Sequence, residues 1–512
     1  MKKGILYILI LCSSVLLIGC GRKKREQITY ESVDSFIAEA EQAYAGGNYN
    51  DALSLYADAI KTNPVSVDAQ IGAAKCQMAL KNYAMASENL SAAARIDPQA
   101  LEIYDMYMEL ADTSKSPYYA RAAVNLAKAN HMESFLARMP KEPVLSLEEG
   151  RYDARQELTI TAEEGAEIMV TEHNGNDRVS YTYDGQPIKL LSGETTVTAY
   201  CTKDGVPGDE VSATYECTYD PIEITFHDPM IEAAVRKQLD RESGPITDLD
   251  CESISYLDCD SYLMRDDEEE ESHPVETLED LKYFPRLQSV QFSDIEIEAA
   301  LSDLGSCRLL RSISMRDCGI SDISFVKSLP QLEYLDISGN QELTDISPAA
   351  DHENLNGLSI SETGVTDLSP LYDKEIRELR LTLSDELGGS VLTRWKDSLY
   401  DLQLYDCGGR DLSWLKECTR LGHLDLAATP DGVFRYDEDM EPLEGLEFLS
   451  SLTNLTFLEL YGLGDASSLE YVKSLKNLTY LSFTMIDRDT EIPEDVIVEL
   501  KKSLPNCSII NY

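Results

Sequence analysis

The sequence predicts a multidomain protein made of α-helical hairpins, a small antiparallel β-sandwich and an α/β solenoid. Three observations carry this prediction. Residues repeat at an interval of 34 in the first quarter of the chain, and polar and apolar residues alternate from Pro143 onward. A leucine pattern recurs in the second half at intervals of 21 to 23, except for one longer interval that holds an insertion. A chain of 512 residues is also too long for one hydrophobic core.

Residues 1–20 are predicted to direct export. Lys2 and Lys3 precede an apolar stretch from Ile5 to Leu11, and Leu17-Ile18-Gly19-Cys20 closes the segment. This ending resembles a lipobox, which implies that Cys20 receives a lipid and becomes the mature N-terminus. An uncleaved anchor helix is the alternative, but the apolar run is short for a bilayer span of about 20 residues. We therefore expect a lipid-anchored protein on the extracytoplasmic face of the cell membrane, with residues 21–31 as a basic linker.

Composition excludes some classes of partner. The formal charge of −48 argues against nucleic acid, because such a chain cannot gain affinity by neutralising phosphates. The longest acidic run, Asp266 to Glu271, lacks the alternating ligands and turn glycine of a calcium loop and is predicted to be a solvated loop. No Cys-x-x-Cys pair occurs and the six histidines are scattered, so we expect neither a metal nor a cofactor.

The cysteines leave the disulfide pattern open. Cys12 leaves with the signal and Cys20 is the lipid site, so ten of the twelve cysteines remain. Cys201 and Cys217 fall in strands that are predicted to be neighbours, and Cys251 and Cys259 are close enough to bridge a loop. Free buried thiols are the equal alternative.

Residues 32–135 are predicted to form helical hairpins. A set of four residues recurs 34 positions later, as Tyr49, Ala52, Ala59 and Pro64 and then as Tyr83, Ala86, Ala93 and Pro98. Small residues let paired helices approach closely, and Asn-Pro or Asp-Pro ends each second helix. The segment resembles tetratricopeptide repeats, with a degenerate third unit that has Pro117 at the tyrosine position. The resemblance implies a groove for peptides or proteins; a structural spacer is the alternative.

Residues 141–219 are predicted to form the sandwich, because alternating strands are separated by glycine-rich turns. Gly150-Arg151-Tyr152, Tyr183-Asp184-Gly185 and Gly193 to Tyr200 give this segment a resemblance to the fibronectin-type module at the C-terminal end of chitobiases and β-hexosaminidases. That module accompanies a catalytic barrel for which this chain has no room, so hydrolase activity is not implied. A rigid spacer is the predicted role, and glycan contact is the alternative.

The second half follows the pattern Leu-x-x-Leu-x-Leu. Nine units begin at Leu287, Leu310, Leu332, Leu355, Ile376, Leu399, Leu421, Leu455 and Leu478. This period resembles leucine-rich repeats, and the tails, such as Leu343-Thr344-Asp345-Ile346-Ser347-Pro348, resemble the internalin-like class of bacterial surface proteins. The resemblance implies a horseshoe over residues 286–512, a cap and acidic loop over 222–285, a helical cap from Phe226 to Leu239, and a closing strand from Leu500 to Tyr512.

The predicted binding face lies on the concave side of this horseshoe. The third, fifth and seventh positions of each unit point away from the core, because strand side chains alternate. The positions selected as the binding face are Tyr334, Asp336, Arg380, Tyr405, Asp425, Phe457, Glu459, Tyr461 and Tyr480. The insertion from Pro430 to Pro442 is expected to add a contact loop, and Cys318 and Cys407, at the ninth position, are expected to be structural.

The sequence favours recognition over catalysis. No Gly-x-Ser-x-Gly, His-Glu-x-x-His, phosphate loop or dinucleotide fingerprint occurs, so we predict that the protein is not an enzyme. The leading hypothesis is binding of a protein ligand at the cell surface. Binding of glycan or cell wall is the second hypothesis, and a scaffold without a ligand is the third.

Overall fold

A computed structural model describes residues 31–175, 177–260, 274–350, 352–430, 440–487 and 492–511. The predicted signal with Cys20, most of the basic linker, the acidic run and residues 431–439 of the insertion lie outside the described residues. The chain divides into two compact units. The first holds Met1–Pro143, Ala162–Glu167 and Tyr200–Glu210, and the second holds Val144–Thr161, Ile168–Ala199 and Val211–Tyr512. Within the described ranges, no helix has the length and apolar character needed to cross a membrane.

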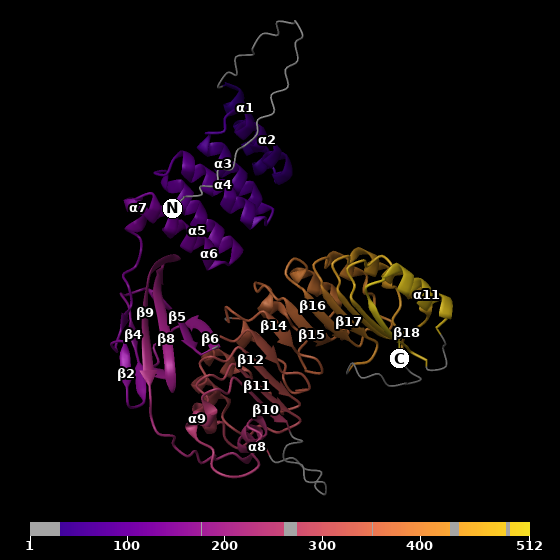
Figure 1. Cartoon of the computed structure of the whole chain (residues 1–512). Helices are drawn as coiled ribbons and strands as arrows, with labels where there is room; N and C mark the ends of the chain where they lie inside the picture. The colour runs from indigo at the N-terminus through magenta and orange to yellow at the C-terminus, as the bar shows by residue number, and fades with distance from the viewer. Residues whose placement is uncertain are drawn as a thin grey trace, which may run out of the picture. The chain divides into compact units, whose positions relative to one another are not determined.

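The first unit contains the predicted helical hairpins (Figure 1). Ala52, Ala59, Ala86 and Ala93 are all fully buried, which lets successive helices pack closely. Pro117 does not disrupt the third hairpin, because it occupies the first turn of a helix, where its missing N–H is not needed. The helices are α1 (Glu31–Ala45), α2 (Tyr49–Thr62), α3 (Val67–Ala79), α4 (Tyr83–Ile96), α5 (Leu101–Ser114), α6 (Pro117–Ala129) and α7 (Glu133–Leu136).

The predicted sandwich is a mixed rather than a purely antiparallel β region. A five-stranded sheet has the order β2-β9-β8-β5-β6, and β1-β4 and β3-β7 form two small sheets. The pairs β1-β4, β3-β7 and β5-β6 are antiparallel, but β2 pairs with β9 in parallel. The expectation was wrong there because β2 joins β9 across a long stretch of chain and not through a hairpin, so no turn imposes antiparallel pairing. The strands are β1 (Val144–Leu145), β2 (Gly150–Tyr152), β3 (Gln156–Leu158), β4 (Ile160–Thr161), β5 (Glu167–Asn174), β6 (Asp177–Thr182), β7 (Ile188–Leu190), β8 (Gly193–Lys203) and β9 (Val206–Cys217).

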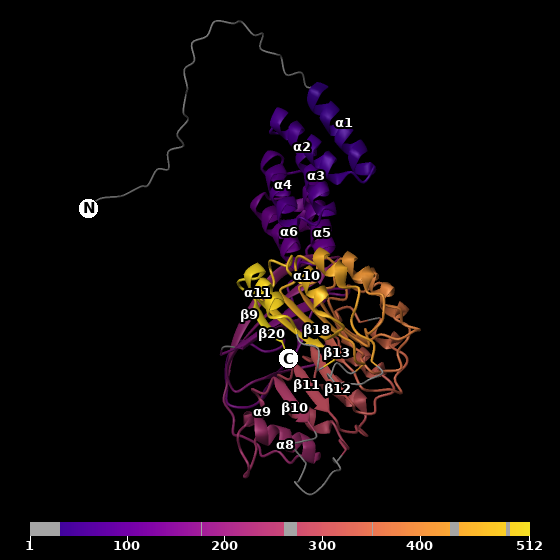
Figure 2. The ribbon, with the colours of Figure 1, turned by 90° about the vertical axis from the view of Figure 1, so that its right-hand side faces the viewer.

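The second half forms the predicted solenoid on a sheet of eleven parallel strands, whose spatial order is the chain order from β10 to β20 (Figures 1 and 2). Short 3-10 turns such as Ser324–Ser328 and Ser413–Glu417 return the chain between strands. The strands are β10 (Tyr256–Asp260), β11 (Ser289–Ser293), β12 (Ser312–Arg316), β13 (Tyr334–Asp336), β14 (Gly357–Ser359), β15 (Glu378–Thr382), β16 (Asp401–Tyr405), β17 (His423–Ala427), β18 (Phe457–Leu463), β19 (Tyr480–Met485) and β20 (Ser508–Asn511).

The two ends of the solenoid differ from the sequence expectation in detail. The sheet begins one strand before the repeat that starts at Leu287. In this first strand, β10, the three leucine positions of the pattern are occupied by Ile254, Leu257 and Cys259. At the other end Glu494–Ser503 is helix α11, so the closing strand β20 begins at Ser508 and not near Leu500. The helices α8 (Pro229–Gln238) and α9 (Asp248–Cys251) lie at the β10 end (Figure 1).

The ten cysteines from Cys76 to Cys507 are free thiols, and nine of them are buried. The possible bridges Cys201–Cys217 and Cys251–Cys259 are therefore not formed. Cys318 and Cys407 are 1% exposed and face the solenoid core, as their repeat position predicts. Burial raises the pKa of the Cys318 thiol to about 12, so this side chain packs as a neutral group.

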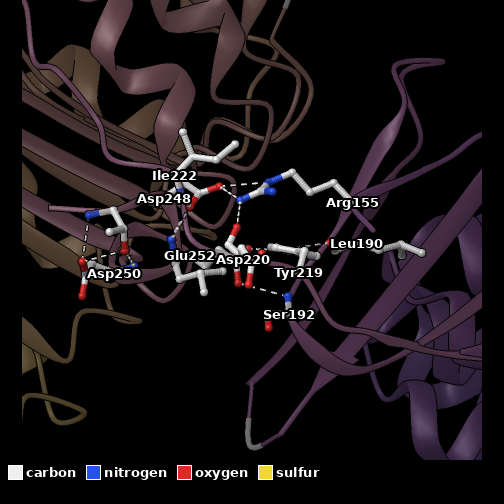
Figure 3. Close-up of polar contacts among 11 residues, drawn as sticks. Arg155, Leu190, Ser192, Tyr219, Asp220, Ile222, Asp248, Asp250 and Glu252 are labelled. Carbon is white, nitrogen blue, oxygen red and sulfur yellow. Dashed lines mark hydrogen bonds and ion pairs between the residues drawn. The ribbon is translucent and has the colours of Figure 1, made fainter. Parts of the chain in front are cut away.

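Within the second unit, a polar cluster joins the β region to the cap of the solenoid (Figure 3). The guanidinium of Arg155 donates to Asp248 Oδ2 at 2.5 Å and to the carbonyl of Asp220 at 2.8 Å. Beside it, the Tyr219 hydroxyl donates to Glu252, and Glu252 also accepts the backbone N–H of Ser192 at 3.1 Å. These contacts fix the β region against the solenoid by directional bonds between segments far apart in sequence.

Candidate functional site

The candidate site is the face of the long sheet that points away from the solenoid core, called the open face below. In register, Leu379, Leu402, Leu424, Leu458 and Leu481 form one buried row toward the core. The residues before and after each of them point to the opposite side, because strand side chains alternate. The third, fifth and seventh positions of the repeats therefore form three rows on the open face, and all nine residues selected from sequence belong to these rows.

The first row contains a ladder of touching side chains at the C-terminal end. Asp401, His423, Phe457 and Tyr480 are register partners on four consecutive strands. The His423 Nδ1 lies 2.7 Å from an Asp401 carboxylate oxygen. The His423 and Phe457 ring centroids are 4.3 Å apart, and the rings of Phe457 and Tyr480 stack at 4.4 Å with an interplanar angle of 9°. The result is a continuous run of rings in which Phe457 and Tyr480 stack and His423, tilted by 58° to Phe457, contacts the Asp401 carboxylate.

The charge of His423 is set by its neighbours. Burial lowers the pKa of this imidazole, but the hydrogen bond to Asp401 and the carboxylates of Asp425 and Glu459 outweigh burial and raise the pKa above its usual value. All these groups are half-buried or buried. The imidazole beside Asp401 therefore takes up a proton more readily than a free histidine does.

The second row places Asp425 beside Glu459 in adjacent strands. Asp425 is 8% exposed, and its Oδ1 has no hydrogen-bond partner among the described residues. Burial, followed by repulsion from Glu459, raises the pKa of Asp425 to about 7, against the opposing effects of His423 and Arg380. The surroundings of Asp425 therefore disfavour its charged form. Carboxyl groups whose charged form is disfavoured in this way are often found at functional sites.

The third row contributes two tyrosines on either side of a small residue. Tyr405, Ala427 and Tyr461 follow one another on β16, β17 and β18. Ala427 is fully buried, while both tyrosines are half-buried and keep part of each ring on the surface. Burial raises the pKa of both hydroxyls, so both remain neutral donors at physiological pH.

The remaining selected residues lie toward the N-terminal part of the same face. Tyr334 covers Gly357 on the next strand, where a Cβ would meet the Tyr334 ring at 2.5 Å. Asp336 is 4% exposed and lies 3.7 Å from Arg316 Nε. Arg380 is on β15, between β13, which carries Tyr334 and Asp336, and β16, where the ladder begins. Its buried Nε has no hydrogen-bond partner within the described ranges. Tyr334, Asp336 and Arg380 thus belong to the same face as the ladder but not to the ladder itself.

Sequence reasoning identified the rows but missed the ion pair of the ladder. Asp401 and His423 are 22 residues apart; both occupy the third repeat position and were therefore expected on this face, but neither was selected among the nine residues. That shared position was the available signal, since equal positions in consecutive repeats lie side by side in a parallel sheet. The insertion around Phe434, Arg435 and Tyr436 lies outside the described residues, so its predicted contact role stays a prediction.

The helical unit has a small cavity of its own. It encloses about 280 Å³ on α1, α2, α3 and α5, and its lining includes Glu41, Tyr44, Asp68, Lys75 and Glu102. Three of these five side chains are acidic, and Lys75 Nζ lies 3.4 Å from Glu102. The cavity is a candidate second contact region.

Comparison with known proteins identifies both repeat types. A leucine-rich-repeat family matches residues 308–350, and a tetratricopeptide-repeat family matches residues 43–107. No curated protein matches the chain. The predicted helical and leucine-rich repeats are thereby confirmed, together with the fold class.

Among solved structures, the chain is similar to an internalin of Listeria monocytogenes, with 20% identity over 56% of this chain and 90% of that one, at a TM-score of 0.35. It is similar to internalin C2 of the same organism, with 20% identity over 51% and 97%, at 0.31. The type III secretion chaperone SycD of Yersinia enterocolitica, solved with a peptide of the translocator YopD, is 17% identical over 22% and 90%, at 0.19.

Proposed function

We propose that this protein is a lipid-anchored recognition protein on the extracytoplasmic face of the cell membrane, and that it binds a protein partner through the open face without catalysing a reaction. The observation that carries the proposal is the ladder of Asp401, His423, Phe457 and Tyr480 with Tyr405 and Tyr461 beside it. Tetratricopeptide and leucine-rich repeats build extended binding surfaces, which supports protein interaction in general terms.

The chemistry of the ladder suits a protein interface. Tyrosine and phenylalanine rings on a rigid sheet bury much apolar area while losing little side-chain entropy, so such rings are enriched at interface hot spots. The polar groups around them, His423, Arg380, Asp425 and Glu459, can supply hydrogen bonds and charge complementarity at the rim. A partner that covered the ladder would also provide the hydrogen-bond donor that Asp425 Oδ1 lacks.

The open face is expected to lose its partner when three rings are removed together. Full-length protein in detergent would be immobilised and exposed in parallel to envelope proteins, host surface proteins and polysaccharides. We expect the wild type to capture a protein, and the variant Tyr405→Ala/Tyr461→Ala/Tyr480→Ala to lose at least tenfold in affinity, because each hot-spot ring contributes on the order of 1 kcal/mol or more.

The matched control is Tyr118→Ala, which removes a ring that is 69% exposed on α6 in the helical unit. Equal capture by the wild type and the triple variant would contradict the assignment to the open face. Capture of polysaccharide, with an affinity that hardly responds to salt, would favour the glycan alternative, since charge-dominated protein binding weakens as salt rises.

The membrane location in this proposal depends on Cys20. Its support is the sequence Leu17-Ile18-Gly19-Cys20, and the helical hairpins and the β region, whose sequence resembles the chitobiase module, are proposed as spacers above the membrane. We expect Cys20→Ser to abolish incorporation of radiolabelled palmitate and to shift the protein out of its lipid-anchored form, because serine offers no thiol for the acyl-bearing group. Cys12→Ser, inside the signal, is the control and should leave labelling intact; unchanged labelling of Cys20→Ser would refute the anchor.

A further inference from the structure

A basic pocket lies in the second unit, where the β region faces the first turns of the solenoid. It encloses about 400 Å³, and its charged lining consists of Lys189, Lys282, Arg286 and Arg308 with Glu172 and Asp184. Four cations against two carboxylates contrast with a chain whose formal charge is −48. The pocket lining is therefore net positive, whereas the protein as a whole is strongly negative.

Glu172 is already neutralised inside the pocket wall. This carboxylate is 2% exposed, accepts the Tyr181 hydroxyl at 2.5 Å and lies 3.2 Å from Arg286 Nη2 and 3.5 Å from Arg308 Nη2. Arg308 also donates to the Tyr181 hydroxyl at 3.0 Å, with its guanidinium carbon 5.0 Å from the centre of that ring. One buried carboxylate thus faces two arginines.

Arg286 is a buried cation of the pocket whose hydrogen-bonding capacity is not fully used. Its side chain is 3% exposed, and among the described residues neither terminal nitrogen has a hydrogen-bond partner, although Nη2 is within ion-pair distance of Glu172. Its other carboxylate neighbour, Asp177, lies 4.0 Å from Nε. A buried guanidinium donor without an acceptor is destabilising, so an acceptor placed in the pocket would remove an existing penalty.

The pocket walls are fixed before any ligand arrives. The Arg155–Asp248 and Tyr219–Glu252 contacts of Figure 3 hold the β region against the solenoid cap. On the side of the pocket, Arg311 Nη2 donates to the carbonyl of Ser180 at 2.6 Å. A preformed site loses little entropy on binding, which favours a small ligand.

We propose that this pocket binds a small ligand through an oxyanion, that is, a carboxylate, sulfate or phosphate group. Arginine presents a planar set of donors that matches such groups, and Arg286 and Arg308 would receive them. Lys189 is exposed, and Lys282 is half-buried with its Nζ 2.5 Å from a carboxylate oxygen of Glu279, so Lys189 is the lysine most accessible to an incoming anion. This site is separate from the open face and does not depend on the partner proposed above.

The test is isothermal titration calorimetry of the full-length protein with inorganic phosphate, sulfate and glucuronate, with glucose as the uncharged match for glucuronate. We expect saturable binding of at least one oxyanion and none of glucose. Lys189→Gln/Lys282→Gln should weaken that binding at least tenfold, while Lys416→Gln, an exposed charge in a distant turn, should change it less than twofold. The lysine substitutions leave the Glu172 cluster intact, and tryptophan fluorescence would verify that both variants are folded.

The relative affinities for the three oxyanions would show which part of the ligand the pocket recognises. Similar affinities for phosphate, sulfate and glucuronate would assign recognition to the oxyanion alone, whereas preference for glucuronate would extend the site to an acidic sugar. No saturable binding of any of the three oxyanions would overturn the proposal. Binding that the double lysine variant retains within twofold would also overturn it, because an anion held in this pocket would have lost two of its four positive neighbours.

Discussion

Replacing Asn340 by alanine is expected to lower the free energy of unfolding of the solenoid by about 3–5 kcal/mol. Asn340 occupies the ninth repeat position and is 2% exposed. Its amide nitrogen donates to the carbonyls of Met315 and Ile337 at 2.7 and 2.8 Å, and its oxygen accepts the backbone N–H groups of Cys318 and Ile320 at 3.1 and 2.8 Å. Alanine would leave these four backbone groups buried without partners.

Urea unfolding followed by tryptophan fluorescence would measure this loss, because both tryptophans of the chain, Trp395 and Trp414, lie in the solenoid. Asn354→Ala is the matched control. That exposed side chain donates to one carbonyl, of Pro330 at 2.9 Å, and its removal should cost less than about 1 kcal/mol. A loss for Asn340→Ala as small as that of the control would show that the repeat does not depend on this inward asparagine.

Replacing Asp425 by asparagine is expected to stabilise the solenoid at pH 8 by on the order of 2–4 kcal/mol and to change its stability little at pH 4. The folded-state pKa of about 7 lies above the value of about 4 for an unfolded aspartate, so the folded state favours the protonated carboxyl. The resulting penalty appears as the pH rises from about 4 and is complete above about 7. Asparagine cannot ionise and escapes the penalty.

The same fluorescence measurement at pH 4, 6 and 8 would check this pH dependence. Asp411→Asn is the control with the opposite sign. Hydrogen bonds from the backbone N–H and the hydroxyl of Ser413 lower the pKa of Asp411, so its charged form is favoured by folding and the variant should lose stability at neutral pH. A stabilisation by Asp425→Asn that is equal at all three pH values would refute the role of ionisation.

The two properties of Asp425 together bear on function. A carboxyl that costs stability at neutral pH and lies on the proposed binding face is expected where binding and stability conflict. Asp425→Asn should therefore weaken partner capture while it strengthens the fold. A variant that gained stability and kept full capture would assign Asp425 no part in the interface.

Much of the solenoid could be predicted because its information is local. Each strand carries its own leucines, and alternation decides which residues face outward, so Tyr405, Phe457, Glu459, Tyr461 and Tyr480 were placed correctly on the open face. The first strand, β10, was missed because Ile254 and Cys259 stand where leucines were expected. Both are buried apolar side chains that satisfy the same core, and a pattern written in leucines does not detect them.

The burial and the charge state of individual side chains could be predicted less well from the sequence. Asp336 and Asp425 were selected as surface contacts, yet they are 4% and 8% exposed. Their burial depends on how neighbouring strands crowd them, which one repeat does not encode. The parallel pairing of β2 with β9 was missed for a related reason, since two short segments separated by many residues carry no signal of their direction.

By itself, the sequence determined the helical hairpins, the alternating β region, the leucine-rich solenoid and the outward rows of that solenoid, because each follows from a short period of apolar residues. The tertiary structure alone decided the ion pair of His423 with Asp401, the unpartnered oxygen of Asp425 and the basic pocket around Arg286. Arg308 and Glu172 of that pocket are 136 residues apart, and no period relates them. They meet because the β region and the solenoid pack against each other.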